Sequence, residues 1–226
     1  MSDDKIPQRS NRETEGISGL LEAASDEAGR ILRAIQEIAG TTSCKGVQIA
    51  GLKKWAQANN CWIPNPDILG DYSDRGSENE VYVQPSNDTV YKLNDFRYAD
   101  DNLTSFFERL RIHNSLFSGC PYDLISFSEN REGKVCAVLS QPFIRADREA
   151  SIEEIAGAMA LMGFMPMDEG EYFSDGKIDI FDAVPNNVLH GKDGQLYFID
   201  TILSPTSDDY FDTYKSKSPN WKKRRE

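Results

Sequence analysis

The amino-acid sequence predicts an α+β fold, on two observations. Some segments carry apolar residues at every third or fourth position, which is the pattern of an amphipathic helix. Other segments are short apolar runs bounded by Gly, Pro, Asn or Asp, which is the pattern of strands and turns. Along the 226 residues, these segments follow the order helix, helix, strand, strand, helix, strand, strand, helix and then three short strands.

The chain is expected to begin with a disordered lead-in over residues 1–16, which are polar and charged without periodicity. An N-terminal helical segment follows over residues 17–60. Its first helix has apolar residues at helical spacing from Ile17 and ends near Gly40, a residue type common at helix C-termini. A second, shorter helix is predicted over residues 52–58.

Residues 70–144 are predicted to form a first lobe with an antiparallel sheet and one helix. Runs rich in β-branched and aromatic residues predict a hairpin, then a helix with one apolar stripe, then two further strands. In chain order, the expected ranges are 80–83 and 89–93 for the hairpin, 102–117 for the helix, and 122–127 and 135–139 for the last two strands.

Residues 145–210 are predicted to form a smaller second lobe, followed by a charged tail over residues 211–226. Ser151 and Glu154 have the spacing of a capping box, which predicts a helix that ends near residue 163. The methionines near the end of this helix are expected to fill the core, and three short strands follow. The methionines are Met159, Met162, Met165 and Met167, and the strands are residues 178–181, 188–189 and 196–199.

Composition excludes several classes of protein. The chain has 25 Lys and Arg against 37 Asp and Glu, and its net charge of −12 is the opposite of the basic footprint of a nucleic-acid-binding protein. The longest nearly apolar stretch, residues 155–167, is too short to cross a bilayer, and the polar N-terminus lacks the apolar segment of a secretory signal. We therefore expect neither nucleic acid nor a membrane as partner.

The cysteines and histidines indicate a reducing compartment and no metal site built from histidines. The four cysteines form no C-x-x-C pair, and only two histidines are present. Free thiols are typical of cytoplasmic proteins, and structural zinc sites need several Cys or His ligands. The protein is therefore expected to be cytoplasmic.

The candidate site combines Asp182, Asn187 and Asp200, which are placed at the ends of predicted strands and turns. Phosphoryl transfer needs such a set. One carboxylate orients or deprotonates the attacking hydroxyl, while an amide and a second carboxylate hold Mg²⁺ against the nucleotide phosphates. A hairpin that turns at Gly194 would bring Asn187 and Asp200 together.

The spacing of these residues resembles the catalytic segment of the protein-kinase-like superfamily. Asp182 and Asn187 fit the loop pattern D-x-x-P-x-N, and Asp200 follows Asn187 by thirteen residues at the end of an apolar strand. Upstream, Lys92 lies in a run similar to the V-A-I-K strand. Gly76 lies in a segment similar to the phosphate-covering loop and is the one glycine kept of three.

Within that superfamily, the chain is most similar to the small kinase domains found in polyvalent proteins of phages and conjugative elements, which are mobile genetic elements. The likeness runs from about residue 50 to about residue 204. It is carried by residues 55–56, 107–117 and 141–144 in addition to the catalytic segment.

The resemblance implies a protein-kinase-like, two-lobed fold with a reduced helical second lobe. It also implies an ATP- and Mg²⁺-dependent enzyme that transfers the γ-phosphoryl group to a hydroxyl on a protein substrate. Asp182 is implied as the catalytic base, Asn187 and Asp200 as the magnesium ligands, Lys92 as the contact to the α- and β-phosphates, and Gly76 as part of the nucleotide-binding loop.

Glu108 is implied as the helix carboxylate that pairs with Lys92 and supports nucleotide binding. Helical periodicity argues against this role, because Glu108 falls about 150° from the centre of the helix's apolar stripe. A helix wedged between two lobes can bury a second face, and Ile112 and Leu116 fall on that far side.

Several features depart from the kinase pattern. The H-R-D motif becomes Ile180-Phe181-Asp182 and D-F-G becomes Asp200-Thr201-Ile202, so regulation by phosphorylation of an activation loop is not expected. Only 26 residues follow Asp200, with no A-P-E-like motif. The helices of residues 17–58 are a candidate to complete the second lobe.

Alternative interpretations stand beside the catalytic one. A pseudokinase would bind nucleotide without turnover, and a non-catalytic interaction protein would have this spacing by coincidence. At the level of single residues, Asp182 and Asn187 also suit an ordinary turn rich in Asp, Asn and Pro. Lys92 also suits a solvated charge on an edge strand.

Overall fold

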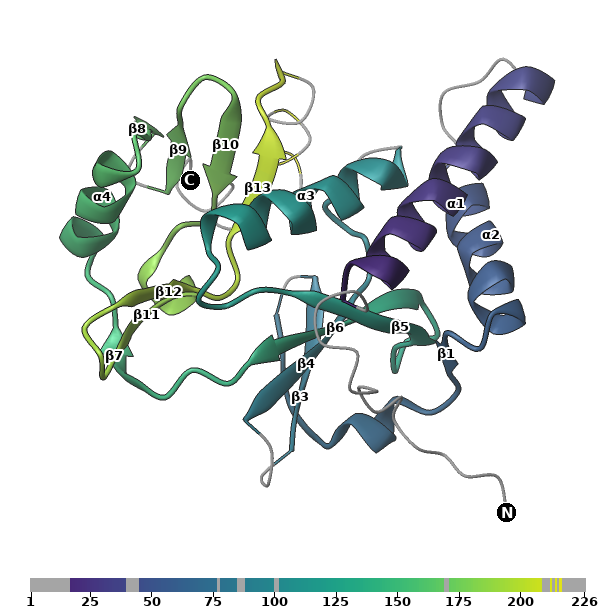
Figure 1. The fold of residues 1–226 in the computed structure, drawn as a ribbon, viewed down its shortest axis with the longest axis horizontal. Helices are drawn as coiled ribbons and strands as arrows, with labels where there is room; N and C mark the ends of the chain where they lie inside the picture. Colours follow the sequence, from purple (N-terminus) through teal and green to yellow (C-terminus); the bar gives the residue numbers. More distant parts are fainter. Residues whose placement is uncertain are drawn as a thin grey trace. The chain divides into compact units, whose positions relative to one another are not determined.

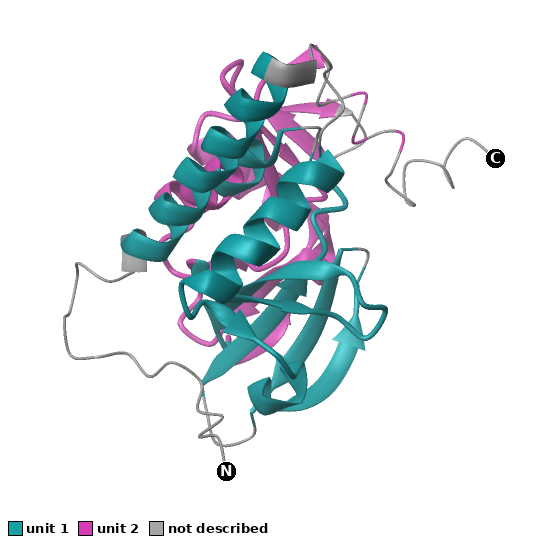
Figure 2. Ribbon diagram, turned by 90° about the vertical axis from the view of Figure 1, so that its right-hand side faces the viewer, with its two compact units in different colours: residues 1–107, 122–143 teal, residues 108–121, 144–226 magenta. Residues whose placement is uncertain are grey.

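The computed structural model of the chain shows a mixed α+β fold (Figure 1). It describes residues 17–39, 45–76, 78–84, 88–99, 102–168 and 171–208, together with residues 212, 214 and 216. The chain divides into two compact units, coloured separately in Figure 2. Unit 1 comprises residues 1–107 and 122–143, and unit 2 comprises residues 108–121 and 144–226. The predicted lead-in over 1–16 and most of the predicted tail over 211–226 lie outside the described residues.

Unit 1 contains a six-stranded sheet with the order β1-β5-β6-β4-β3-β2. Adjacent strands of this sheet pair antiparallel, except β1 and β5, which pair parallel. The predicted hairpin is confirmed as β3 and β4, with Val81 opposite Lys92. In sheet order the bounds are β1 Trp62–Ile63, β5 Asp123–Glu129, β6 Val135–Pro142, β4 Thr89–Asn94, β3 Asn79–Val83 and β2 Asp71–Arg75.

The sequence does not predict β1 or β2. Strand β1 has only two residues, which is too short to show alternation. Strand β2 has the sequence Asp-Tyr-Ser-Asp-Arg and is exposed along most of its length, because it forms the edge of the sheet. Neither strand therefore carries the apolar pattern that identifies a half-buried strand.

Helices α1 (Ile17–Ala39) and α2 (Lys45–Ala58) pack against each other and against the sheet of unit 1. Helix α1 contacts β5, and α2 contacts β1, β5 and β6. The two helices approach closely at Gly51, where a Cβ atom would lie 2.5 Å from Ile31 Cδ1. The hypothesis that these helices complete the second lobe is wrong, because both pack within unit 1.

Helix α2 begins at Lys45, earlier than the predicted start at residue 52. Its first turns contain glycine and glutamine in place of an apolar stripe, so periodicity misses them. Gln48 in these turns is buried, and its side-chain oxygen accepts a hydrogen bond of 3.1 Å from the backbone N–H of Leu103. Leu103 starts helix α3 (Leu103–Leu116), so Gln48 satisfies one of the free N–H groups at the start of that helix.

One hydrophobic cluster of unit 1 comprises Ile63, Leu69, Tyr82, Tyr91, Leu93, Cys136 and Val138. Outside this cluster, buried Phe106 in the first turn of α3 meets the ring of Phe96 edge-on, with centroids 4.9 Å apart. From Glu108 onward, α3 belongs to unit 2.

Unit 2 is built mainly from short strands, which corrects the expectation of a helical second lobe. One sheet has the order β13-β10-β9-β8 and the other has the order β12-β11-β7. Each of these strands has three or four residues, too few to be identified from alternation alone. In chain order the elements are β7 Ala146–Glu149, α4 Ile152–Leu161, β8 Met165–Asp168, β9 Tyr172–Ser174, β10 Ile178–Phe181, β11 Val188–Gly191, β12 Leu196–Phe198 and β13 Ile202–Pro205.

Helix α4 begins with the predicted capping box. The Ser151 hydroxyl accepts a hydrogen bond from the Glu154 N–H (3.2 Å), and the Glu154 carboxylate accepts one from the Ser151 N–H (2.8 Å). Arg148 donates two further hydrogen bonds of 2.7 Å to the same carboxylate. The Arg148 contact, with help from the cap, lowers the pKa of Glu154 to about 2. The capping carboxylate therefore stays ionised far into the acid range.

The prediction that four methionines fill the core is right for one of them. Met159 is fully buried, whereas the exposed fractions of Met162, Met165 and Met167 are 38%, 65% and 56%. Helix α4 ends before Met162, and β8, which carries Met165 and Met167, is the edge strand of its sheet. These three side chains can therefore pack against the core on only one side.

Two substitutions in α4 test the contrast between buried and exposed side chains near the end of this helix. Met159→Ala is expected to lower the free energy of unfolding by about 2–5 kcal/mol, because it opens a cavity in a filled core. Leu161→Ala, two residues away, is expected to change it by less than about 0.5 kcal/mol, because the Leu161 side chain is 92% exposed. Urea denaturation of both variants measures the difference, and equal losses would contradict the assigned burial.

Candidate active site

The catalytic-loop residues predicted from the sequence lie together in unit 2. Strand β10 ends at Phe181, and Asp182 follows it directly. Asn187 lies in the short 3-10 turn Pro185–Asn187 and is 5% exposed. Its side-chain Nδ2 donates two hydrogen bonds to Asp182, one to the backbone carbonyl (2.9 Å) and one to carboxylate Oδ2 (3.0 Å). The amide of Asn187 thus fixes both the backbone and the carboxylate of Asp182.

Asp182 has an unusual backbone conformation. Its φ of 58° lies in the left-handed region, which few residues other than glycine adopt. Conformations of this kind cluster at active sites, where the surrounding structure holds them in place. Here the Asn187 bond to the Asp182 carbonyl is one such restraint. Asn60 and Phe96 have nearly the same φ, so this conformation is compatible both with a functional loop and with an ordinary turn.

Strand β10, which precedes Asp182, is anchored by a buried carboxylate. Asp179 is 1% exposed and accepts hydrogen bonds from the hydroxyls of Ser174 (2.6 Å) and Thr206 (2.8 Å). These bonds join β9, β10 and the residue after β13. Burial, together with Asp179, raises the pKa of Tyr172 to about 12. The strand that precedes Asp182 is therefore held by its neighbours on both sides.

Asp200 is brought to this loop by the hairpin of β11 and β12. The two strands pair antiparallel, with Val188 opposite Phe198, as the sequence predicts. Just beyond the pairing, the backbone N–H of Ile199 donates a hydrogen bond of 2.9 Å to the carbonyl of Asn187. Asp200, which is half-buried, directly follows this residue, so its backbone is held next to Asn187. Asp182 and Asn187 are therefore in direct contact, and Asp200 follows the residue whose backbone bonds to Asn187.

Two side chains of this region, Asn187 and Asp200, carry oxygens of the type that binds Mg²⁺. Both Asn187 Nδ2 bonds go to Asp182, which turns the side-chain oxygen of Asn187 away from that carboxylate. That oxygen accepts a hydrogen bond of 3.0 Å from Asn186. Mg²⁺ is usually held by one or two side-chain oxygens plus phosphates and water. Asn187 and Asp200 can supply such oxygens. Among the described residues, no group of three or more His, Cys, Asp or Glu is placed to hold a metal ion.

Lys92 lies in the interior of unit 1. It is on β4, which pairs with β3 on one side and β6 on the other, and it is 5% exposed. Its Nζ donates a hydrogen bond of 3.2 Å to the hydroxyl of Tyr122. The interpretation of Lys92 as a solvated charge on an edge strand is therefore wrong. A buried ammonium group is costly unless it has partners, and here Tyr122 supplies both its hydroxyl and its ring, whose centroid lies 5.2 Å from Nζ.

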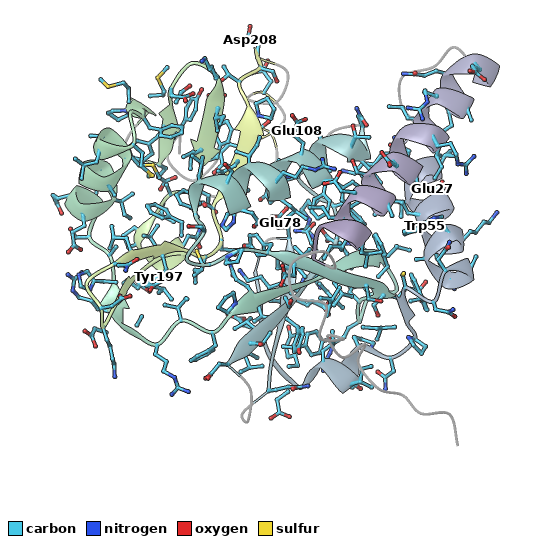
Figure 3. All side chains as sticks on the ribbon, viewed as in Figure 1. Glu27, Trp55, Glu78, Glu108, Tyr197 and Asp208 are labelled. Carbon is cyan, nitrogen blue, oxygen red and sulfur yellow. The ribbon has the colours of Figure 1, made fainter. Side chains whose placement is uncertain are left out.

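The other two residues that the sequence predicts for the site, Gly76 and Glu108, are exposed. Gly76 lies between β2 and β3, and its N–H donates a hydrogen bond of 2.8 Å to the Asn79 carbonyl, which closes that turn. Glu108 is exposed on α3, as periodicity indicates (Figure 3). Its pairing with Lys92 remains a prediction, as does the convergence of Lys92 with the residues of unit 2.

Two residues near the site are not predicted by the sequence. Tyr122 is the hydrogen-bond partner of Lys92, and His113 of α3 contacts the backbone at Phe198. Each contact joins positions far apart in the chain, so no local pattern identifies it. A weak signal for His113 is its place among the apolar residues of α3, where a histidine needs a specific partner.

Kinase-like enzymes use a lysine of an antiparallel sheet and a loop with an aspartate and an asparagine for phosphoryl transfer. This chain has residues of the same types on β4 and in the loop after β10. A model of the family described as a serine/threonine/tyrosine kinase found in polyvalent proteins matches residues 45–206. The chain belongs to this family, as the resemblance of its motifs predicts. Searches of curated proteins and of solved structures found no match.

Proposed function

We propose that the protein transfers the γ-phosphoryl group of ATP to a hydroxyl group, in a reaction that depends on Mg²⁺. The observation that carries the proposal is the double hydrogen bond from Asn187 to Asp182, next to the backbone contact that brings in Asp200. This arrangement supports a catalytic carboxylate beside two oxygen ligands for a metal. Family membership supports the same reaction class.

Each residue then has a distinct role. Asp182 accepts the proton of, or orients, the attacking hydroxyl, and Asn187 keeps its carboxylate in place. Asn187 and Asp200 hold the metal, and Lys92 contacts the α- and β-phosphates. Gly76 lies in the loop that covers the nucleotide, and Glu108 pairs with Lys92. Bound Mg²⁺ neutralises charge on the phosphates, so the rest of catalysis is mainly positioning.

The acceptor is proposed to be a protein side chain. The description of the matching family names serine, threonine and tyrosine, whose hydroxyl groups are the acceptors of protein kinases. A net charge of −12 favours neutral or basic protein surfaces over acidic ones. We further propose that the two units correspond to the two lobes of a kinase.

A reducing, cytoplasmic location fits the described cysteines. Cys61, Cys120 and Cys136 are free thiols. Burial, as the main cause, raises the pKa of the Cys136 thiol far above its usual range, so this group stays protonated and unreactive. In the described part of the chain, no helix combines the length and the apolar character that crossing a membrane requires.

The direct test is phosphoryl transfer from γ-³²P-labelled ATP to a histone mixture, a basic protein probe, with and without Mg²⁺. We expect Mg²⁺-dependent labelling of the histones or of the protein itself. Nucleotide binding without any labelling would favour the pseudokinase, with which Phe181 at the position of the H-R-D arginine is also compatible. Absence of both binding and labelling would contradict the proposal.

Asp200→Ala tests the metal site by binding alone. At 100 times its dissociation constant, a ligand that binds only the folded state adds about 2.7 kcal/mol of stability. For a chain of this size, that raises the melting temperature by about 5–10 °C. We expect Asp200→Ala to remove most of this shift with Mg-ATP, because one metal ligand is lost. Asp147→Ala, at an exposed position of β7 in unit 2, should keep it. An undiminished shift in Asp200→Ala would remove Asp200 from the metal site.

A further inference from the structure

Phe198 is the last residue of β12 and lies two residues before Asp200. Its backbone carbonyl has two partners from the second half of α3 and the segment after it. His113 Nε2 lies 2.9 Å from the oxygen, and Cys120 Sγ lies 3.4 Å from it. A carbonyl oxygen only accepts, so the Nε2 atom of His113 must carry the proton.

Ring contacts hold the side chain of Phe198 as well. Phe117 stacks on it with centroids 4.3 Å apart and an angle of 13° between the planes. His113 in turn meets Phe117 edge-on at 5.3 Å. His113, Phe117 and Phe198 have exposed fractions of 2%, 6% and 3%. The carbonyl and the ring of Phe198 are therefore both fixed by groups that are closed off from water.

The opposite side of Phe198 faces the metal-binding segment. Phe198 pairs with Val188, the residue after Asn187, and the N–H of the next residue, Ile199, bonds to the Asn187 carbonyl. A shift of Phe198 would therefore move Asp200 relative to Asn187. Mg²⁺ demands near-ideal octahedral geometry at short distances, so it tolerates little displacement of its ligands.

We propose that His113 is a positioning residue for the magnesium site: through the Phe198 carbonyl it fixes where Asp200 stands relative to Asn187. The inference rests on the proposed function, because it assumes that these two residues hold the metal. His113 is 2% exposed and acts through the Phe198 carbonyl, so its loss is expected to change how much Mg²⁺ is needed and to leave contacts to the nucleotide in place. Outer partners of metal ligands typically contribute 10–100-fold in metal affinity.

The test is a Mg²⁺ titration of the binding of a fluorescent ATP analogue to the full chain. His113→Phe keeps an aromatic ring against Phe117 and removes the N–H donor. We expect the Mg²⁺ concentration at half-maximal binding to rise about 10-fold or more, with the dissociation constant for the analogue in EDTA unchanged. His190→Phe is the matched control, since His190 lies on β11, where its Nε2 is 4.0 Å from a Glu154 oxygen, and it should behave like wild type.

Two polar variants keep the inference testable if His113→Phe does not fold. His113→Gln can place an amide N–H near the position of Nε2 and should restore the Mg²⁺ requirement of wild type. His113→Asn is too short to do so and should raise it. An unchanged Mg²⁺ requirement in both His113→Phe and His113→Asn would overturn the inference. So would a loss of analogue binding in EDTA as large as the loss in Mg²⁺, because that result indicates a general disruption of the nucleotide site. If Mg²⁺ does not change binding of the analogue to the wild-type protein, the result contradicts the proposed function itself, apart from any role of His113.

Discussion

Asp182→Asn is expected to lower the rate of phosphoryl transfer by about 10² to 10⁴, the contribution typical of a general base. The substituted amide can still accept the hydrogen bond from Asn187 Nδ2 through its own oxygen, so the loop should keep its shape. What is lost is the negative charge that attracts the proton of the acceptor. Initial rates of ³²P transfer under saturating Mg-ATP measure the effect.

Binding should survive this change, which separates a catalytic role from a structural one. The thermal shift with Mg-ATP is expected to stay close to that of wild type in Asp182→Asn. Asp147→Asn makes the same chemical change at an exposed site of the same unit and should leave the rate unaltered. Wild-type activity in Asp182→Asn would remove Asp182 from the role of base.

Lys92→Met is expected to abolish most of the 5–10 °C rise in melting temperature that Mg-ATP should give, a range that follows from about 2.7 kcal/mol of ligand stabilisation. Methionine keeps an apolar stem of similar length in the buried position on β4 and removes the ammonium group. The loss of binding is then attributable to the missing charge at the phosphates. The melting temperature without nucleotide shows whether the sheet remains intact.

Lys54→Met provides the control for this experiment. Lys54 is exposed on α2 of unit 1, so its substitution removes the same charge at the surface. It should keep the full nucleotide-dependent shift. If Lys92→Met also keeps it, the buried lysine serves the fold of unit 1 and not the nucleotide.

The parts of the site that the sequence predicts are those with local signals. The hairpin of β11 and β12 is marked by apolar runs on either side of Gly194, whose φ of 78° is conformationally natural for glycine. The capping box at Ser151 depends on residues within one turn. The catalytic loop combines fixed spacings over a few residues. Short-range patterns of this kind survive folding unchanged, which is why they could be identified.

What the sequence does not predict depends on contacts between distant positions. The Lys92–Tyr122 bond spans 30 residues and the His113–Phe198 contact spans 85. The burial of Lys92 in a central strand likewise follows from sheet order, since β6 joins β4 only after the intervening helix and strand. Short strands such as β9 and β13 are stabilised by their neighbours and carry little pattern of their own.

The most direct test of the central claim is a crystal structure of the protein with Mg²⁺ and a non-hydrolysable ATP analogue. We expect Lys92 Nζ within hydrogen-bond distance of the α- or β-phosphate, and oxygens of Asn187 and Asp200 at about 2.0–2.1 Å from the metal. A nucleotide bound away from Asn187 and Asp200, or a Lys92 that faces no phosphate, would contradict the account.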